Sequence, residues 1–264
     1  MNDTLPPQPR FSKPRVGLFV TCLVDLMRPS VGFAALRLLA RAGAEVVVPD
    51  GQTCCGQPAY NSGDMKNARK LAQNVIEAFA DFDHVVAPSG SCAGQIVHHY
   101  PKLFADDPDW RSKAEDLATR TFELTAYLVE HLDLNDSGAV FHGSATYHDS
   151  CAGLRELGIK KQPRHLLATV DGLILNELEE SEACCGFGGL FSIKYPDVSG
   201  AIVDKKADRV EKAEADLLLG GDLGCLMNMS GKLRRRGSGV RVFHVAEVLA
   251  NMTDGPAIGE DVDA

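Results

Sequence analysis

The sequence predicts an α/β protein made of two tandem, related domains with mainly parallel sheets and an approximate two-fold relation between the halves. Three observations support this prediction: a cysteine pattern occurs twice, short β-branched segments alternate with helical ones, and 264 residues with 45% hydrophobic content can fill two cores. We place the boundary near Ser137-Gly138. This division gives a first cysteine-rich domain at 1–136 and a second at 137–264.

The repeated cysteine pattern is the strongest sign of a duplication. Each copy has one cysteine, then a doublet followed by glycine, then another cysteine, at nearly equal intervals in the two halves. Small buried cysteines scattered through a core would not repeat in this way. The first set is Cys22, Cys54, Cys55 and Cys92, and the second set is Cys151, Cys184, Cys185 and Cys225.

Strands and helices alternate along both halves. Strands are expected at 16–20, 45–48 and 84–87, and again at 145–148, 173–175 and 217–219, because these runs are short and apolar. Helices are expected at 31–42, 64–82 and 197–213, the last with a mixed-charge face that includes Lys205 and Lys206. The segment 100–134 interrupts the repeat and is expected to be an extra helical segment plus a linker.

The predicted strands each precede a cysteine. In parallel sheets, ligands gather beyond the carboxyl ends of the strands, so the cysteines are expected on loops at that edge. Two adjacent cysteines in an extended strand would point to opposite faces, and their convergence therefore requires a turn. Gly56 and Gly186, which follow the doublets, provide the backbone freedom for that turn.

The chemistry of the cysteines favours an iron–sulfur cluster in each half. Disulfides are rare in the reducing cytosol, where we expect this chain to reside, so metal or redox chemistry is the leading explanation for eight cysteines. Zinc sites are usually built from C-x2-C knuckles, and neither half contains one. Adjacent cysteines can instead bind different irons of one cluster. Zinc or a dithiol site is the alternative.

Four segments around the cysteines carry a resemblance to a known family. The segments are Cys22-Leu23-Val24-Asp25, the run from Cys54 to Gly63, Tyr147-His148-Asp149-Ser150-Cys151, and the run from Cys184 to Gly189. They resemble the signatures of the CCG cysteine-rich domain found in heterodisulfide reductase and in the iron–sulfur subunits of glycolate oxidase and anaerobic glycerol-3-phosphate dehydrogenase, and are most similar to those of the lactate utilisation protein A family. The resemblance extends from Val16 to about Val248.

The resemblance implies an iron–sulfur redox subunit of a complex that oxidises L-lactate to pyruvate. It also implies partners, namely a ferredoxin-like iron–sulfur subunit and a further subunit, and a small 2-hydroxy acid as substrate. The full heterodisulfide reductase motif has a fifth cysteine, but Gln95 and Asn228 stand at its positions here. Four thiolates per half suffice for a 4Fe-4S cluster, whereas a modified, non-cubane cluster would lack its complete ligand set.

Charge and motifs exclude several other functions. The formal net charge of −9 argues against nucleic acid as a partner. Residues 1–14 are expected to form a flexible lead-in, with neither a signal peptide nor a transmembrane segment. No G-x-G-x-x-G follows a strand, so a hydride acceptor must come from another subunit or cofactor.

The remaining candidate residues and functions stay open. His148 could orient a sulfur, accept a proton or simply end a strand, and no catalytic residue is assigned. A basic run could dock an acidic partner or a carboxylate substrate, or could be a solvated helix face. A glycolate oxidase-type subunit and a non-redox zinc-binding adaptor are the alternative functions. The basic run is Lys232, Arg234, Arg235 and Arg236.

Overall fold

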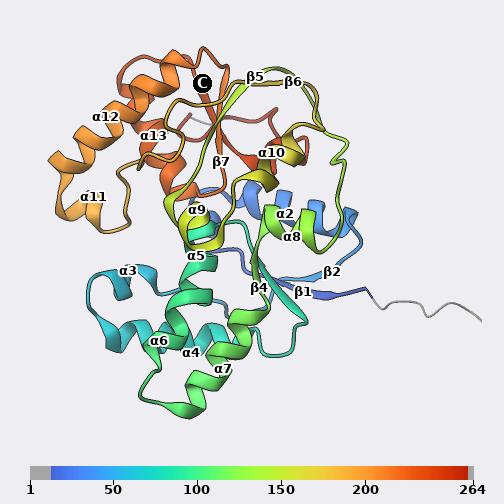
Figure 1. Cartoon of the computed structure of the whole chain (residues 1–264), viewed down its shortest axis with the longest axis vertical. Coiled ribbons are helices and arrows are strands. Elements are labelled where there is room, and N and C mark those ends of the chain that lie inside the picture. Colours follow the sequence, from blue (N-terminus) through green and yellow to red (C-terminus); the bar gives the residue numbers. More distant parts are fainter. Residues whose placement is uncertain (1–12, 261–264) are drawn as a thin grey trace, which may run out of the picture.

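A computed structural model describes residues 13–260, and within these residues the strands form two four-stranded, all-parallel sheets (Figure 1). The predicted α/β class with two tandem units and parallel sheets is confirmed. The first sheet has the order β2-β1-β3-β4 and the second has the order β6-β5-β7-β8. The strands are β1 (Arg15–Leu18), β2 (Glu45–Val47), β3 (His84–Ala87), β4 (Thr121–Glu123), β5 (Val140–His148), β6 (Asp171–Leu175), β7 (Leu217–Gly220) and β8 (Arg241–His244).

The helices follow the strands in the same sequence in both halves. The helices 31–42, 64–82 and 197–213 expected from the sequence are found as α2, α4 and α12, with slightly different ends. The first half contains α1 (Cys22–Met27), α2 (Pro29–Arg41), α3 (Gln57–Asn61), α4 (Met65–Ala78), α5 (Gly90–Gly94), the π-helix η1 (Gln95–His99), α6 (Tyr100–Leu103), α7 (Pro108–Thr119) and α8 (Leu124–Glu130). The second contains α9 (Cys151–Leu157), α10 (Lys161–Leu167), α11 (Phe191–Lys194), α12 (Pro196–Lys212), α13 (Leu223–Arg235) and α14 (Val245–Leu249).

Local chemistry explains where several helices begin. Asp64 accepts a hydrogen bond from the Asn67 backbone N–H at the start of α4, which satisfies one of the unpaired donors of its first turn. Pro29 occupies the first position of α2, where its missing N–H has no cost and its fixed φ suits a helix. These signals lie in the sequence itself, which is why the two helices were predictable.

The segment 100–134 is more regular than expected. Besides α6 and α7 it contains β4 and α8, which are repeated in the second half as β8 and α14. Only α7 lacks a counterpart among the residues described in the second half. The expectation of an extra helical segment plus a linker was therefore wrong for 121–130, because a strand of three residues is too short to show a periodic pattern.

A layer of helices between the two sheets joins the halves. α2 of the first half packs against α14 of the second, and α10 of the second half packs against α8 of the first. This exchange of equivalent contacts is what an approximate two-fold axis produces. Arg28 from the start of α2 forms an ion pair of 2.8 Å with Glu247 of α14, and Leu38, Tyr127, Leu166 and Phe243 lie in one continuous buried core.

A second pair of contacts repeats the same symmetry. α5 packs against α9, and α1 packs against α13, its symmetry equivalent. At the first contact the backbones approach closely, because a Cβ on Gly90 would lie 2.8 Å from the Cα of Gly153. His98 also donates a hydrogen bond of 2.8 Å from Nε2 to the Glu156 backbone oxygen on α9. The histidines that follow Cys92 thus serve the contact between halves.

The boundary at Ser137-Gly138 lies in the connection between α8 and β5. The division at residue 136 stays a prediction, because the buried core is shared across it. The predicted lead-in at 1–14 lies almost entirely outside the described residues. Within residues 13–260, each helix is too short or too polar to cross a membrane.

Candidate metal centres

Each cysteine doublet lies on a loop that turns at the following glycine. Gly56 and Gly186 both adopt a positive φ, +79° and +82°, which side-chain-bearing residues rarely adopt. At Gly186 a Cβ would also lie 2.7 Å from the backbone oxygen of Ser199. The turn that the sequence predicted is therefore present in both halves. The four single cysteines differ from the doublets, since each begins or lies in the first turn of a helix after a strand.

The first set of cysteines converges on one point at the carboxyl edge of the first sheet. The sulfurs of Cys55 and Cys92 are 3.4 Å apart. Side-chain contacts with Cys22 and Cys55 lower the pKa of the Cys54 thiol, and the contact with Cys54 raises the pKa of the Cys22 and Cys55 thiols. A metal bound at this point would displace the protons of these thiols.

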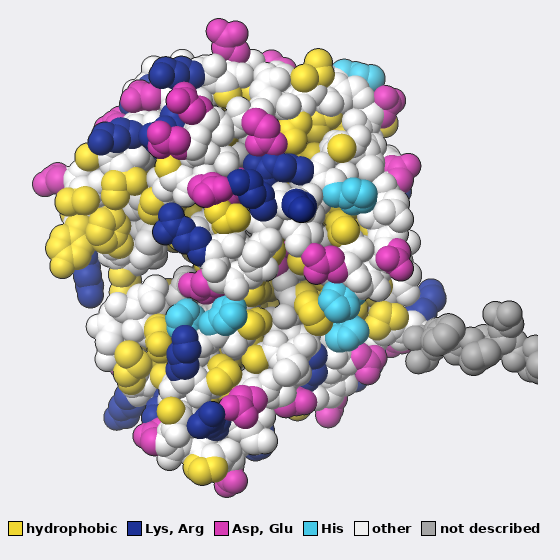
Figure 2. Space-filling model, in the orientation of Figure 1, with side chains coloured by type: hydrophobic (Ala, Val, Ile, Leu, Met, Phe, Trp, Pro, Cys, Tyr) yellow, Lys and Arg dark blue, Asp and Glu magenta, His cyan; other side chains and the backbone are white. Residues whose placement is uncertain are grey.

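A cavity of about 340 Å³ opens directly onto the first set. All four sulfur-bearing residues line it, and the second half closes its other side with apolar residues of the loop 187–193. Figure 2 shows exposed apolar side chains gathered over α11, beside a hollow between the two parts of the molecule. Ile193 and Tyr195 belong to this apolar surface, with 74% and 58% of their area exposed. The first site is thus reachable from solvent.

The second set is divided between a buried and an exposed pair. Cys185 and Cys225 are buried, while Cys151 and Cys184 are exposed. Burial raises the pKa of Cys151, and the neighbouring Cys184 adds to this effect. A hydrogen bond between Cys184 and Cys185, followed by burial, raises the pKa of Cys184 as well. The exposed pair therefore carries its protons until a metal displaces them.

His148 lies beside the buried pair. One ring nitrogen of His148 and the sulfurs of Cys185 and Cys225 all lie within 4.8 Å of one another. Burial, reinforced by the charge of Lys206, lowers the pKa of His148 to about 3. His148 ends β5, which is one of the roles considered from the sequence, and it also lies next to two of the sulfurs. The alternating pattern of a strand shows which face a residue occupies but not what lies opposite.

Lys206 is also buried, although the sequence placed it on a charged helix face. Its ammonium group donates hydrogen bonds to the backbone oxygens of Glu180 and Ser181, at 3.1 and 2.8 Å. Burial lowers its pKa to about 8, and it interacts electrostatically with Cys185 and Cys225. A positive charge therefore stands beside the two buried cysteines of the second set.

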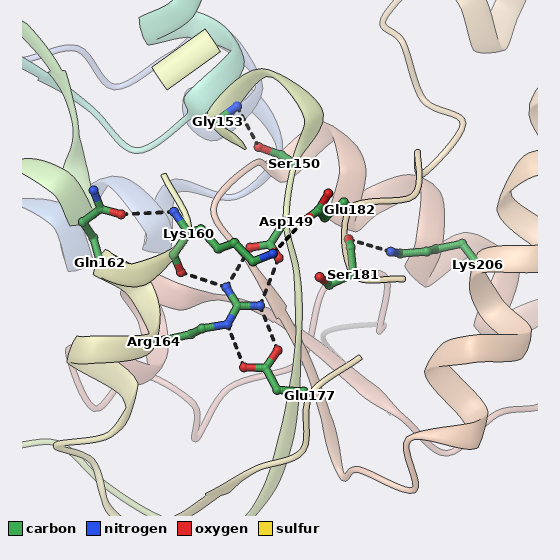
Figure 3. Close-up of polar contacts among 10 residues, drawn as sticks. All are labelled: Asp149, Ser150, Gly153, Lys160, Gln162, Arg164, Glu177, Ser181, Glu182 and Lys206. Atoms are coloured by element: carbon green, nitrogen blue, oxygen red, sulfur yellow. Dashed lines mark hydrogen bonds and ion pairs between the residues drawn. The ribbon is translucent and has the colours of Figure 1, made fainter. Parts of the chain in front are cut away.

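An ion-pair network holds the segment that carries His148 and Cys151 (Figure 3). The guanidinium group of Arg164 contacts both carboxylate oxygens of buried Asp149, at 2.8 and 3.0 Å, and also binds Glu177. Such two-point pairing fixes orientation as well as distance. Ser150 then accepts a hydrogen bond from the Gly153 backbone N–H and caps α9. The chain is thus fixed on both sides of the two candidate ligands.

Asp222 connects the two sites. It lines the cavity of the first site, and its carboxylate accepts hydrogen bonds from the Ser91 backbone N–H at 2.9 Å and the Ser89 hydroxyl at 3.3 Å. Ser91 precedes Cys92, and Asp222 lies one helical turn before Cys225. Its charge raises the pKa of Cys151 and Cys225. The two sets therefore lie on either side of one short polar bridge.

Gln95 and Asn228, which stand where a fifth cysteine would lie in each half, are polar residues; Gln95 is buried and Asn228 is half-buried. The Asn228 side-chain amide donates a hydrogen bond of 2.9 Å to the Cys185 backbone oxygen. Both side-chain polar atoms of Gln95 are buried without a hydrogen-bond partner among the described residues. The Asn228 side chain therefore supports the backbone of the cysteine doublet and does not take the place of a sulfur ligand.

The basic run near the end of α13 is engaged within the protein. Lys232 and Arg236 form ion pairs with Asp204 of α12, both at 2.8 Å, and Arg236 also binds Asp208 and Glu211. These contacts join α12 to α13. A helix-to-helix role thus accounts for Lys232 and Arg236 of this run.

Comparison with known proteins identifies the pattern. The model of the cysteine-rich domain named CCG matches residues 16–97 and 145–230, so each half contributes one match. The chain belongs to the CCG cysteine-rich domain family. Lactate utilization protein A of Geobacillus kaustophilus is 51% identical over 235 residues, which are 89% of this chain and 98% of that protein. The protein of the same name from Bacillus subtilis is 50% identical over the same shares.

A solved structure supports the fold of the two CCG units. A hypothetical protein from Helicobacter pylori matches with a TM-score of 0.61 at 13% identity, over 97% of this chain and 50% of that one. This chain therefore spans about half the length of that structure. The likeness supports the arrangement of sheets and helices.

The donor sets of both CCG units fit a metal centre. In the first unit, four thiol sulfurs gather next to a cavity. In the second, two buried sulfurs adjoin an imidazole whose ring nitrogens have no hydrogen-bond partner among the described residues. Cysteine sulfur and histidine nitrogen are ligands for zinc and for iron–sulfur clusters. The grouping of cysteines thus suggests metal binding.

Proposed function

We propose that this protein is the iron–sulfur redox subunit of a cytoplasmic complex that oxidises L-lactate to pyruvate. The observation that carries the proposal is the convergence of cysteine side chains on one cavity. It occurs in a chain whose sequence is about 50% identical to proteins named lactate utilization protein A. Each CCG unit would hold one iron–sulfur cluster. The ligands would be Cys22, Cys54, Cys55 and Cys92 in the first unit, and Cys151, Cys184, Cys185 and Cys225 in the second.

The spacing of the sulfurs supports a cluster in the first unit. A doublet that turns at Gly56 sends two adjacent sulfurs toward one cavity, where they can bind different irons. Four thiolates match the ligand number of a 4Fe-4S cluster, and a modified, non-cubane cluster is the other form consistent with this family. Iron–sulfur clusters supply one-electron transfer, which thiolates alone do not provide.

The residues between the sites support passage of electrons. Oxidation of lactate to pyruvate releases two electrons and two protons, and two clusters can accept one electron each. Asp222 and Ser91 bridge the backbone segments that carry Cys225 and Cys92, so the separation of the two centres is fixed. Electrons would leave to a ferredoxin-like subunit, and a further subunit would supply the group that accepts hydride from the substrate.

The test compares the protein alone with the complete complex. The purified, anaerobic protein should contain iron and sulfide in both units but should not oxidise lactate by itself. The complex with its partner subunits should reduce an artificial acceptor when lactate is added. Lactate oxidation by the isolated chain, or a complex whose rate is unaffected by removal of this chain, would contradict the proposal.

Glycolate is the substrate to test beside lactate. It is also a 2-hydroxy acid, and related CCG domains belong to glycolate oxidase. Faster acceptor reduction with glycolate than with lactate would reassign the substrate and keep the redox role.

A zinc-binding adaptor is the second candidate function. The observation in its favour is the compact group of His148, Cys185 and Cys225, whose ligand atoms lie within 4.8 Å, a spacing suited to a single ion. Zinc without iron in anaerobically purified protein, together with a silent electron paramagnetic resonance spectrum after reduction, would support the adaptor. Iron, sulfide and a signal on reduction would exclude it.

A further inference from the structure

The two CCG units offer different donors to a metal. His148 lies three residues before Cys151, and the residue three before Cys22 is Phe19. Phe19 is fully buried and packs edge-on against Phe79, with ring centroids 5.6 Å apart. The fold therefore accepts an apolar ring at this position. Packing in the core alone does not explain why the second unit has a histidine there.

The imidazole of His148 is buried, and it only approaches the Ser181 backbone without forming a full hydrogen bond. The side chain is 1% exposed, and neither ring nitrogen has a hydrogen-bond partner among the described residues, including the sulfurs. A buried polar group without a hydrogen-bond partner is destabilising. Packing in a core does not offset this cost, whereas a bond from one ring nitrogen to a metal does.

The distances fit coordination. Two ligands on one tetrahedral metal are about 3.3–3.8 Å apart, given metal–nitrogen and metal–sulfur bonds of about 2.0 and 2.3 Å. The ligand atoms of His148, Cys185 and Cys225 lie within 4.8 Å of one another before any metal draws them together. Small rotations of the side chains close the difference.

The neighbouring groups leave the His148 nitrogen and the two buried sulfurs free to bind a metal. Lys206 stands close to Cys185 and Cys225, where its positive charge would compensate the negative charge of metal-bound sulfurs. Its ammonium group is itself held by two backbone oxygens, so it does not compete as a ligand. Asp149 is held by Arg164, and its carboxylate is thereby kept from His148.

We propose that His148 is a ligand of the metal centre in the second CCG unit, which therefore has a mixed sulfur and nitrogen donor set, while the first unit uses sulfur alone. The buried donors are His148, Cys185 and Cys225, and the exposed Cys151 and Cys184 complete the set. The inference rests on the proposed function only in taking iron–sulfur as the resident centre; the donor set itself is independent of it.

The first test looks for nitrogen bound to the reduced centre. Protein labelled with ¹⁵N in the histidine rings is purified anaerobically, reduced and examined by pulsed electron paramagnetic resonance. We expect the hyperfine coupling of a directly bound imidazole nitrogen in the wild type and its loss in His148→Phe, which copies Phe19 of the first unit. His84→Phe is the matched control, because His84 is bound to Tyr127 at the opposite end of the first sheet.

Two outcomes of the first test would overturn the inference. One is a wild-type centre with full iron content and no histidine coupling. The other is a coupling that persists in His148→Phe. Both would leave the proposed redox function intact, because iron and sulfide would still be present.

The second test does not need an iron–sulfur cluster. Apo-protein with Cys55→Ser, which disables the first site, is titrated with Co²⁺, whose visible spectrum reports sulfur ligation and tetrahedral geometry. We expect His148→Phe to weaken Co²⁺ binding at least tenfold and His148→Cys to restore it with stronger sulfur-to-metal bands. Equal affinity in His148→Phe and its parent would contradict the inference, whether or not iron supports lactate oxidation.

Discussion

The two CCG units share one cysteine framework but differ in what surrounds it. In the first, Phe19 and Val75 pack near the cysteines, whereas the second has His148 and Lys206 at the corresponding positions. The correspondence of Val75 with Lys206 follows from the glycine turns, since Gly56 faces Leu71 of α4 and Gly186 faces Ile202 of α12, each four residues earlier. Duplication thus preserved the cysteine framework while the neighbouring residues diverged, so the two candidate sites have different surroundings.

Removing one proposed ligand from either unit tests whether both units are needed for growth on lactate. We expect this change to have the largest effect on growth of all those proposed here. Cys55→Ala and Cys185→Ala should each lower the iron content by about half and abolish growth on lactate, because a cluster ligand is lost. Each protein should remain folded by circular dichroism.

Gly200→Ala is the control for these variants, because a methyl group there would meet nothing within 4 Å. It should keep full iron and normal growth on lactate. Normal growth of one of the two cysteine variants would show that its unit lies off the electron path, and the comparison would then divide the units into one redox centre and one structural centre.

The residues that cap α8 and α14 should give the two halves opposite pH responses. Burial raises the pKa of Glu123 to about 7, so the unfolded chain loses this proton first. The free energy of unfolding should fall by about 3 kcal/mol between pH 4.5 and 7 on this account. Burial lowers the pKa of His244, and its contribution should be lost instead as the pH falls below about 6.5.

Urea unfolding between pH 4.5 and 8 measures both responses. Glu123→Gln should remove the loss on the alkaline side, and His244→Asn, which keeps a capping side chain, should remove the loss on the acid side. If the curve for Glu123→Gln runs parallel to that of the wild type, the Glu123 carboxyl group is not the source of the pH dependence.

The contact between the halves at α5 and α9 should tolerate an added methyl group less well than the other helix contacts do. Gly90→Ala places a methyl group 2.8 Å from the Cα of Gly153, and such overpacking costs about 1–3 kcal/mol. The symmetry-related contact between α1 and α13 has Leu223 at the equivalent position, so the two contacts are not packed alike.

Thermal unfolding compares Gly90→Ala with Gly200→Ala in the middle of α12. The second change should stabilise the protein by up to about 1 kcal/mol, since alanine is the better helix former and the space is open. A Gly90→Ala variant as stable as the wild type would mean that the halves can separate slightly at this point.

The smallest expected effect is on the difference in reduction potential between the proposed metal centres of the two units. Lys206→Met removes a positive charge beside Cys185 and Cys225 and should lower the reduction potential of the second centre by on the order of 50 mV, as one charge at an effective dielectric constant near 20 is worth about 1–2 kcal/mol. A redox titration followed by electron paramagnetic resonance measures the shift.

Val75→Met is the matched change in the first unit. It exchanges one neutral side chain for another in the equivalent position and should leave both potentials within error. Equal shifts in the two variants would attribute the effect to packing and not to charge.

The cysteine framework was predictable because cysteines are rare and their repeat is independent of tertiary structure. The parallel sheets followed from apolar runs such as 217–219, and α4 from its capping Asp64. β4 was not predicted because three residues are too few to show an alternating pattern of apolar side chains. Its counterpart in the second sheet, β8, was not predicted either.

The roles of His148 and Lys206 could not be read from the sequence, because they depend on which elements pack together. A histidine at the end of a strand meets the doublet loop only after the sheet has formed. Lys206 looks like part of a solvated helix face, yet it is buried against the backbone of 180–181. Periodicity predicts a face of an element but not the groups that cover it.

The packing of α14 against α2 has a consequence for biosynthesis. Arg28 and Glu247 are separated by 219 positions, and Arg37 likewise binds the backbone oxygen of Ala250, 213 positions away. During translation, α2 must therefore wait for almost the whole chain to leave the ribosome before its buried face is covered. We expect the nascent first half to need protection from aggregation and premature oxidation during this interval, with metal loading completed only after release.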